Sequence, residues 1–403
     1  MYFRDNALHF SRGAQTLDEV MELLRNVSDV ISANFPTIPV IPSLGNHDFV
    51  PKDEARTNYS EPYGRIADIW KTWIGDDRQM ELFKKGGYFS RRVGESGKLL
   101  VLSVNTILYY IHNHINLGLT DPAGQFTWME KQLEMARREG LKVIVTGHVM
   151  PGLRIPGLEH LFHPDFSRRY ADIMTDFSDV IVASHYGHEH AEVFKLLRRE
   201  NSPLDAAVPV FSAMSIAPMA RALKPGQPKY PLQPSVRLVE FDRATAHHLN
   251  YRQFYTNLTQ SNLNNYTNWV ELYNFRDTYG VPDMSVASLR DIFRRMVSAQ
   301  SLTINNNTIN NNNSTSTCCS SNDAGHTLSP ASPVLATGQV VNPLSSFCRH
   351  ILGPMGPAEC PLVDQAEIWC GGQISDLSGA RQCVQFYLLA HSGQATTPSG
   401  KQN

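Results

Sequence analysis

Three short apolar segments of this chain each run directly into polar side chains that can bind a metal ion or carry a proton. The segments cover residues 38–42, 141–145 and 178–184, and the polar side chains that follow them are Asn46, His47 and Asp48, then His148, then His188 and His190. Apolar runs of this length are typical of buried strands. In an α/β sheet, ligands bind where such strands end. The pattern therefore predicts a sheet whose strand ends converge on one functional site.

Helical segments alternate with these strands in the first half of the chain. Apolar residues recur at helical spacing over 16–34, where Thr16 and Glu19 form a capping box. A second helix is expected to begin at Asp121 and to end at Gly140, with strands at 86–93 and 98–106 before it. Strands follow one another more closely later on. The chain is therefore predicted to fold as an α/β sandwich of two mixed sheets flanked by helices.

The bulk composition excludes some partners. The chain has 403 residues, 42% of them apolar, with 36 basic and 38 acidic residues and a net charge of −2. Without a strong basic run, a nucleic-acid polymer is not expected as a partner. No stretch has the length and apolarity of a transmembrane segment.

The six cysteines lie in the last quarter of the chain and predict a local disulfide framework there: Cys318, Cys319, Cys348, Cys360, Cys370 and Cys383. The alternative is a set of free thiols in a reducing compartment. Glycosylation acceptor triplets begin at Asn26, Asn58, Asn257 and Asn265. Together with the cysteines, they favour a secreted or lysosomal glycoprotein.

Composition divides the chain into four parts. We expect a catalytic domain over 1–256, a helical region over 257–300 and an Asn/Ser-rich, disordered insertion over 301–346. A Cys-containing segment over 347–403 completes the chain as part of a small helical C-terminal region.

The polar strand ends suit a hydrolytic metal site. His188 and His190 are two residues apart, so on an extended segment both would face one pocket. Imidazoles with Asn and Asp oxygens form the mixed ligand set of open zinc sites, and two such ions suit attack on phosphorus. Each residue also has a structural interpretation: a lone His148 is often a packed core residue, and Asn46 and Asp48 favour turns. His185 fits no matching pattern and is interpreted as structural.

The order of the motifs resembles the calcineurin-like metallophosphoesterases. Those motifs are Gly-Asn-His-Asp at 45–48, Gly-His at 147–148 and Gly-His-x-His at 187–190, and the start of the chain, with Arg4 in place of glycine before Asp5, resembles the family's Gly-Asp motif. Asp5 with His9, and the segments 145–152, 187–194 and 269–283, are similar to the acid sphingomyelinase and acid sphingomyelinase-like phosphodiesterase family.

The resemblance implies a role for each residue. Asp5 corresponds to a carboxylate that bridges two zinc ions. The other ligands of the second ion correspond to Asn46, His148 and His188. His190 corresponds to a ligand of the first ion. His47 corresponds to the acid that protonates the leaving oxygen, Asp48 to a residue that orients it, and His9 to a second active-site histidine. The implied reaction is hydrolysis of a phosphodiester, either sphingomyelin, giving ceramide and phosphocholine, or a nucleotide, with peripheral contact to a lipid surface for a lipid substrate.

The family's opening Asp-x-His strand has no counterpart before Asp5, which predicts an N-terminally truncated chain with an incomplete first metal site. This departure leaves open a catalytically impaired remnant that acts as a secreted binding protein. A purple-acid-type phosphomonoesterase is a third alternative, but its Asp-x-x-Tyr ligand pair is not evident.

Overall fold

The main sheet of the protein has six strands in the order β3-β4-β5-β6-β8-β7. The computed structural model describes residues 2–4, 15–57, 61–94, 97–199, 202–203, 206–222, 226, 229–304, 343–351, 360–374 and 376–391. The inner strands β4, β5, β6 and β8 are parallel, and β3 and β7 pair antiparallel at the two edges. The strands are β3 Phe89–Val93, β4 Leu99–Ser103, β5 Lys142–Thr146, β6 Ile181–Tyr186, β7 Val193–Leu197 and β8 Val208–Ser212.

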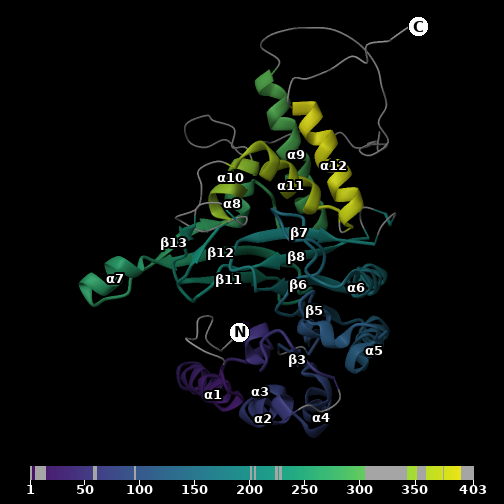
Figure 1. The fold of residues 1–403 in the computed structure, drawn as a ribbon, viewed down its shortest axis with the longest axis vertical. Helices are drawn as coiled ribbons and strands as arrows, with labels where there is room; N and C mark the ends of the chain where they lie inside the picture. Colours follow the sequence, from purple (N-terminus) through teal and green to yellow (C-terminus); the bar gives the residue numbers. More distant parts are fainter. Residues whose placement is uncertain are drawn as a thin grey trace.

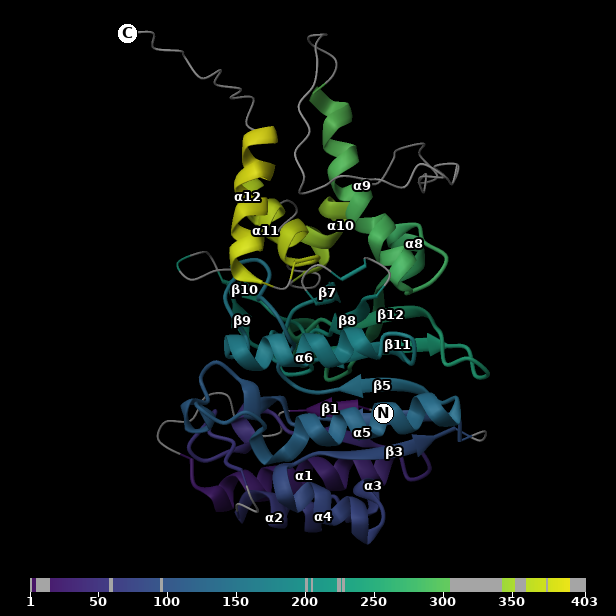
Figure 2. The same cartoon turned by 90° about the vertical axis from the view of Figure 1, so that its right-hand side faces the viewer.

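Helices flank this sheet, as Figures 1 and 2 show. α5 (Gln125–Glu139) packs on β5, and α6 (Pro164–Asp176) lies beside α5 and β7. β1 (Tyr2–Arg4) pairs in parallel with β2 (Ile41–Ser43). Four helices lie at the bottom of the molecule in Figure 1: α1 Leu17–Asn34, α2 Glu61–Ile69, α3 Lys71–Ile74 and α4 Asp77–Gly86. The predicted mixed α/β class is confirmed.

Local sequence signals set the start of α1 and the end of α5 as expected, whereas α5 begins at Gln125, four residues after the predicted start. The hydroxyl of Thr16 accepts a hydrogen bond from the Glu19 amide, and the Glu19 carboxylate accepts one from the Thr16 amide, which is the predicted capping box. Gly140 ends α5 in the left-handed region with φ of 65°. The Asp121 carboxylate accepts the amides of Phe126 and Thr127, so it caps α5 after a short 3₁₀ turn, Pro122–Gly124.

A second, three-stranded sheet corrects part of the sequence prediction. β11 (Ser235–Phe241), β12 (His248–Thr256) and β13 (Trp269–Asn274) are antiparallel throughout, so this sheet is not mixed. The helical region predicted over 257–300 is wrong across β13. Its Trp, Val, Leu and Tyr side chains favour a strand, and β12 supplies the pairing partner. The helix α7 (Leu258–Asn264) joins β12 to β13 and projects from the side of the molecule in Figure 1.

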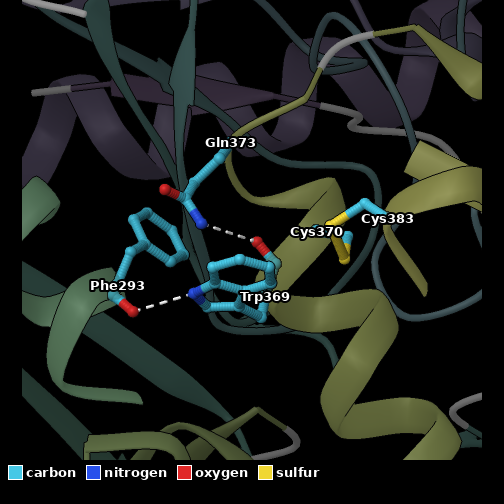
Figure 3. Close-up of a disulfide and its surroundings, with 5 residues drawn as sticks. All are labelled: Phe293, Trp369, Cys370, Gln373 and Cys383. Atoms are coloured by element: carbon cyan, nitrogen blue, oxygen red, sulfur yellow. Dashed lines mark hydrogen bonds between the residues drawn. A yellow bond between two sulfur atoms is a disulfide. The ribbon is translucent and has the colours of Figure 1, made fainter. Parts of the chain in front are cut away.

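The C-terminal helices form a disulfide-linked cap above β7. α9 (Val286–Ile304) packs on β7 and β8, preceded by α8 (Phe275–Tyr279) and followed by α10 (Pro343–His350), α11 (Leu362–Gly371) and α12 (Leu377–His391). Disulfides join Cys348 to Cys360 and Cys370 to Cys383. In Figure 3 the indole of Trp369, next to Cys370, donates to the Phe293 carbonyl at 2.8 Å and so ties α11 to α9. The predicted disulfide framework is confirmed for these four cysteines.

Several predictions fall outside the described residues. They concern Asp5, His9, Asn58, Cys318 and Cys319, and most of the expected low-complexity insertion, residues 305–342. Its first four residues, 301–304, belong to α9 and its last four, 343–346, to α10, so the prediction is wrong at both ends. Across the described helices, none combines the length and the hydropathy needed to cross a bilayer.

Acid is expected to weaken this fold, because two histidines, the buried His248 and the partly buried His350, are held in their neutral form. Burial, with a smaller contribution from the charge of His247, lowers the pKa of His248 to about 4, and burial beside Arg349 lowers that of His350 to about 4. Between pH 6.5 and 4 the unfolded chain binds protons that the folded chain does not, so stability falls as pH falls, by about 2–3 kcal/mol per histidine.

Thermal denaturation at pH 7 and pH 4.5 measures this loss. The His248→Gln variant should show a smaller drop than the wild type, because it no longer has that titrating ring. Equal pH dependence in the two proteins would contradict the role of His248.

Candidate functional site

Three side chains from distant segments meet at the strand ends. Oδ1 of Asn46 lies 2.9 Å from Nε2 of His148 and 3.1 Å from Nδ1 of His188. The two imidazole nitrogens are 3.2 Å apart. Asn46 and His148 are almost fully buried, at 2% and 1% exposed. We call these three residues the Asn46–His148–His188 centre.

His148 is placed by a close approach of the backbone at the end of β5. A Cβ at Gly147 would lie 2.6 Å from Cγ2 of Thr106, so no larger residue fits between the strand and that side chain. The hydroxyl of Thr106 accepts the amides of His148 at 3.1 Å and Val149 at 2.9 Å. The backbone after β5 is therefore held by Thr106, and the His148 ring points into the centre.

His188 comes from a turn after β6, and here the sequence reasoning needs correction. The segment is not extended: His188 has φ of 68° and His190 has φ of 52°, both in the left-handed region. Such backbone is strained for residues other than glycine and is concentrated at functional sites. The Gly187 amide donates to the His148 carbonyl at 2.9 Å and joins this turn to the end of β5.

Asp53 sets the orientation of the Asn46 amide. Nδ2 of Asn46 donates to Oδ1 of Asp53 at 2.7 Å, and the Asp53 amide donates to the Asn46 carbonyl at 3.0 Å. A carboxylate can only accept here, so the amide nitrogen faces Asp53 and the oxygen faces the two histidines. Asp53 was not selected from the sequence, because nothing in its local context distinguishes it from a turn residue.

The other predicted site residues surround the same cavity or lie beside it. His47 and His190 line a cavity of about 340 Å³ together with Asn46 and His188, and Nδ1 of His190 contacts Sδ of Met219. Asp48 is fully buried, and its carboxylate accepts the Gly45 amide at 2.8 Å, which closes the 3₁₀ turn Asn46–Asp48. Asp5 and His9 lie outside the described residues. His185 lies apart, 3.0 Å from His248 through their Nε2 atoms, as expected of a structural histidine.

The centre suits a divalent cation. Ligand atoms bound at about 2.0–2.1 Å with near-tetrahedral or octahedral angles are about 2.8–3.4 Å apart, and the 2.9–3.2 Å separations found here lie in that range. Two imidazoles with an amide oxygen make a mixed nitrogen–oxygen donor set. No group of three or more His, Cys, Asp or Glu side chains suited to metal binding occurs in the described part of the chain. The donor set of the centre is two imidazoles and one amide oxygen.

The hydroxyl of Tyr110 contacts the ring nitrogen of His188 that does not face Asn46. The hydroxyl lies 3.1 Å from Nε2 of His188, and the two rings meet edge to face. When Nε2–H donates to Tyr110, Nδ1 keeps its lone pair for a cation. Tyr110 was also missed in the sequence, because a tyrosine in this loop belongs to none of the motifs selected there.

Loss of the Asp53 carboxylate should weaken cation binding by about 10–100-fold, the usual effect of removing a partner that orients a ligand. Asp53→Gly is the suitable change, because φ of 72° favours glycine and the backbone is not strained further. Competitive titration of zinc against a chromophoric chelator measures the affinity. Asp53→Asn keeps an acceptor oxygen and should retain most of it. Equal affinity in the glycine variant and the wild type would contradict the orienting role.

Two family models match this chain. Residues 9–192 match the calcineurin-like phosphoesterase model, and residues 209–323 match the acid sphingomyelin phosphodiesterase C-terminal region. The first match ends just past the turn that carries His188 and His190, and it includes Asn46 and His148. The second contains the three-stranded sheet and all of α9.

Several curated proteins are similar over most of the chain. "Cyclic GMP-AMP phosphodiesterase SMPDL3A" of Rattus norvegicus is 32% identical over 288 residues, covering 70% of this chain and 62% of that protein. "Acid sphingomyelinase-like phosphodiesterase 3b" of Homo sapiens is 33% identical over 287 residues, with coverage of 70% and 62%. "Sphingomyelinase phosphodiesterase C" of Dictyostelium discoideum is 30% identical over 301 residues, with coverage of 74% and 66%. The chain thus spans about 62% of the length of the first two relatives.

Proposed function

Because this chain belongs to the acid sphingomyelinase and acid sphingomyelinase-like phosphodiesterase family of calcineurin-like phosphoesterases, as its motifs predicted, we propose that it hydrolyses phosphodiesters at the Asn46–His148–His188 centre. The observation that carries the proposal is the meeting of one amide oxygen and two imidazole nitrogens within 3.2 Å of one another. These atoms come from three segments separated by 102 and 40 positions in the sequence. Proteins of the calcineurin-like family usually bind metals, and the donor set fits one.

We assign the following roles to the residues of this chain. Asn46, His148 and His188 hold a divalent cation, with Asp53 and Tyr110 orienting two of these ligands. When bound, the cation supplies Lewis acidity, which polarises a phosphoryl group and raises the acidity of water. His47 lines the cavity next to Asn46 and, when protonated, donates a proton to the leaving oxygen. Asp48 holds the turn that carries His47.

Zinc is the proposed metal, because neutral imidazoles with an oxygen ligand suit it. The prediction of a second ion involves His190 and Asp5. His190 lines the same cavity, whereas Asp5 is outside the described residues. The roles of Asp5 and His9, and the number of ions, therefore stay predictions.

Turnover of bis(p-nitrophenyl) phosphate tests the proposal directly. We expect the purified full chain to hydrolyse it, to lose activity when dialysed against a chelator, and to regain it with zinc. Hydrolysis that survives complete removal of metal would overturn the mechanism. A chain that binds zinc and phosphate but turns nothing over would instead be a binding protein, the alternative class.

Two substrate classes follow from the names of the relatives. One is described as a cyclic GMP-AMP phosphodiesterase and another as a sphingomyelinase phosphodiesterase. For this chain, nucleotide-type diesters and sphingomyelin are both proposals, and contact with a lipid surface would be needed only for the second.

A secreted or lysosomal location is also proposed. Disulfides persist mainly in oxidising compartments, and two are present here. Among the acceptor triplets, Asn257 and Asn265 are exposed on the projecting α7 segment, whereas Ser28 of the Asn26 triplet is buried and accepts a hydrogen bond from Trp70.

N-glycosidase treatment of chain secreted from eukaryotic cells should therefore remove sugar from Asn257 or Asn265. The absence of any sugar would count against this location.

A further inference from the structure

Arg154 lies in the wall of the cavity that contains the Asn46–His148–His188 centre. It lines that cavity together with Asn46 and His188, and its side chain is 21% exposed. It follows β5 in the chain, and it was not singled out by any sequence motif. A guanidinium in this place faces the same space that a substrate phosphate would occupy.

Two carboxylates hold the Arg154 side chain in position. Its Nε is 3.0 Å from Oε2 of Glu189, and its Nη1 is 3.1 Å from Oε2 of Glu159. Glu189 is itself almost buried, and its Oε1 lies 3.9 Å from Nε2 of His188. Burial opposes the charge on Arg154, but the charges of Glu189 and Glu159 outweigh it and raise its pKa, so the guanidinium stays charged. Arg154 is thus a fixed cation linked to the centre through Glu189.

The guanidinium keeps hydrogen-bond donors for a ligand. It has five N–H groups, and the contacts with Glu159 and Glu189 described above use one donor each on Nη1 and Nε. A planar guanidinium with adjacent free N–H groups matches a phosphate oxygen pair. The carboxylates fix its direction, and so less freedom is lost when an anion binds.

The rest of the lining is poor in groups that bind a quaternary ammonium ion. Such ions are recognised by cages of aromatic rings. Tyr110 is the one Phe, Tyr or Trp among the described residues that line this cavity. The two acidic residues of the lining, Glu159 and Glu189, are both paired with Arg154. Lys52 adds a second cation at the cavity, with its side chain 55% exposed.

We propose that Arg154 is a substrate-binding residue that selects phosphodiesters with a second anionic group next to the scissile phosphate. This inference rests on the proposed function and narrows its substrate class. It favours diesters of nucleoside diphosphate type over the phosphocholine ester of a sphingolipid. Arg154 binds the anionic group beyond the scissile phosphorus, while the centre holds the scissile group itself.

Three substrates with one leaving group test the proposal: the p-nitrophenyl esters of a nucleoside diphosphate, of phosphorylcholine and of p-nitrophenyl phosphate. Wild type should have its lowest KM for the first. Arg154→Gln should raise that KM about 10–100-fold, as expected for loss of a charged hydrogen bond, and change the other two less than about threefold. The KM of Arg154→Lys for the nucleoside diphosphate ester should lie between those of the wild type and Arg154→Gln. Arg168→Gln, an exposed arginine on α6, is the matched control and should leave all three unchanged.

Equal losses on all three esters, with unchanged zinc content and melting temperature, would overturn the proposal. If Arg154→Gln fails to fold because Glu189 loses its partner, Arg154→Lys carries the test, since it keeps the charge. If no ester is hydrolysed, the proposed function fails, but the role of Arg154 can still be tested by calorimetry of nucleoside diphosphate binding. Nucleoside diphosphate should then bind the wild type at least about tenfold more tightly than Arg154→Gln does, and equal affinities would refute the inference.

Discussion

His148→Ala is expected to remove zinc from the centre and to lower kcat/KM for phosphodiesters by well over 100-fold. The loss should exceed the about 10–100-fold seen when an outer partner of a metal ligand is removed, because His148 supplies a ligand atom itself. Its Nε2 lies within 3.2 Å of both other ligand atoms. Steady-state kinetics and elemental analysis of the same preparation measure the two effects together.

His247→Ala is the control for this change. His247 is half-exposed and pairs with Asp283 away from the cavity, so its loss should leave zinc content and kcat/KM unchanged. If His148→Ala kept its zinc and its activity, the metal would lie elsewhere and the assignment of this centre would be wrong.

Arg237→Met is expected to lower the free energy of unfolding by about 3–5 kcal/mol, since it leaves a buried carboxylate without its cation. Arg237 on β11 is ion-paired with Glu192, which is fully buried at the start of the main sheet's edge strand. The guanidinium also donates to Gln253 at 2.9 Å and lies 3.9 Å from the centre of the Tyr251 ring. The pair therefore joins the second sheet to the main one, and chemical denaturation measures the change.

Two further variants make this result specific. Arg92→Met breaks a surface Arg–Glu pair with Glu139, where both side chains are more than 40% exposed, and should cost less than about 1 kcal/mol. Glu192→Met combined with Arg237→Met removes both charges and should recover much of the lost stability. A double variant as unstable as Arg237→Met alone would show that packing, not the unpaired charge, is responsible.

The site residues that could be found from the sequence share one property: each follows directly after a buried strand. Asn46, His148 and His188 belong to short motifs at such points, and the parallel order of β5 and β6 brings their ends together. The motifs determine which residue types occur at these positions, and the sheet determines where their side chains lie. The site predicted from the motifs therefore agrees with the observed one. The reason given for His188 and His190 was nevertheless wrong, because the backbone turns through left-handed conformations that no spacing rule indicates.

The residues that were missed act through contacts between loops. Asp53 and Arg154 lie several residues beyond the strand-end motifs, and Tyr110 lies in a third loop. Their partners are 7, 78 and 35 positions away in the sequence. Local patterning cannot reveal such pairs. The same limit explains β13: the sequence predicts a helix there, and pairing with β12 makes these residues a strand instead.

Anomalous X-ray diffraction at the zinc edge, from crystals of the full chain grown with zinc, tests the central claim most directly. We predict a peak about 2.0–2.2 Å from Oδ1 of Asn46, Nε2 of His148 and Nδ1 of His188. A zinc peak coordinated by other residues, or a zinc-loaded crystal with no peak between these three atoms, would contradict the account.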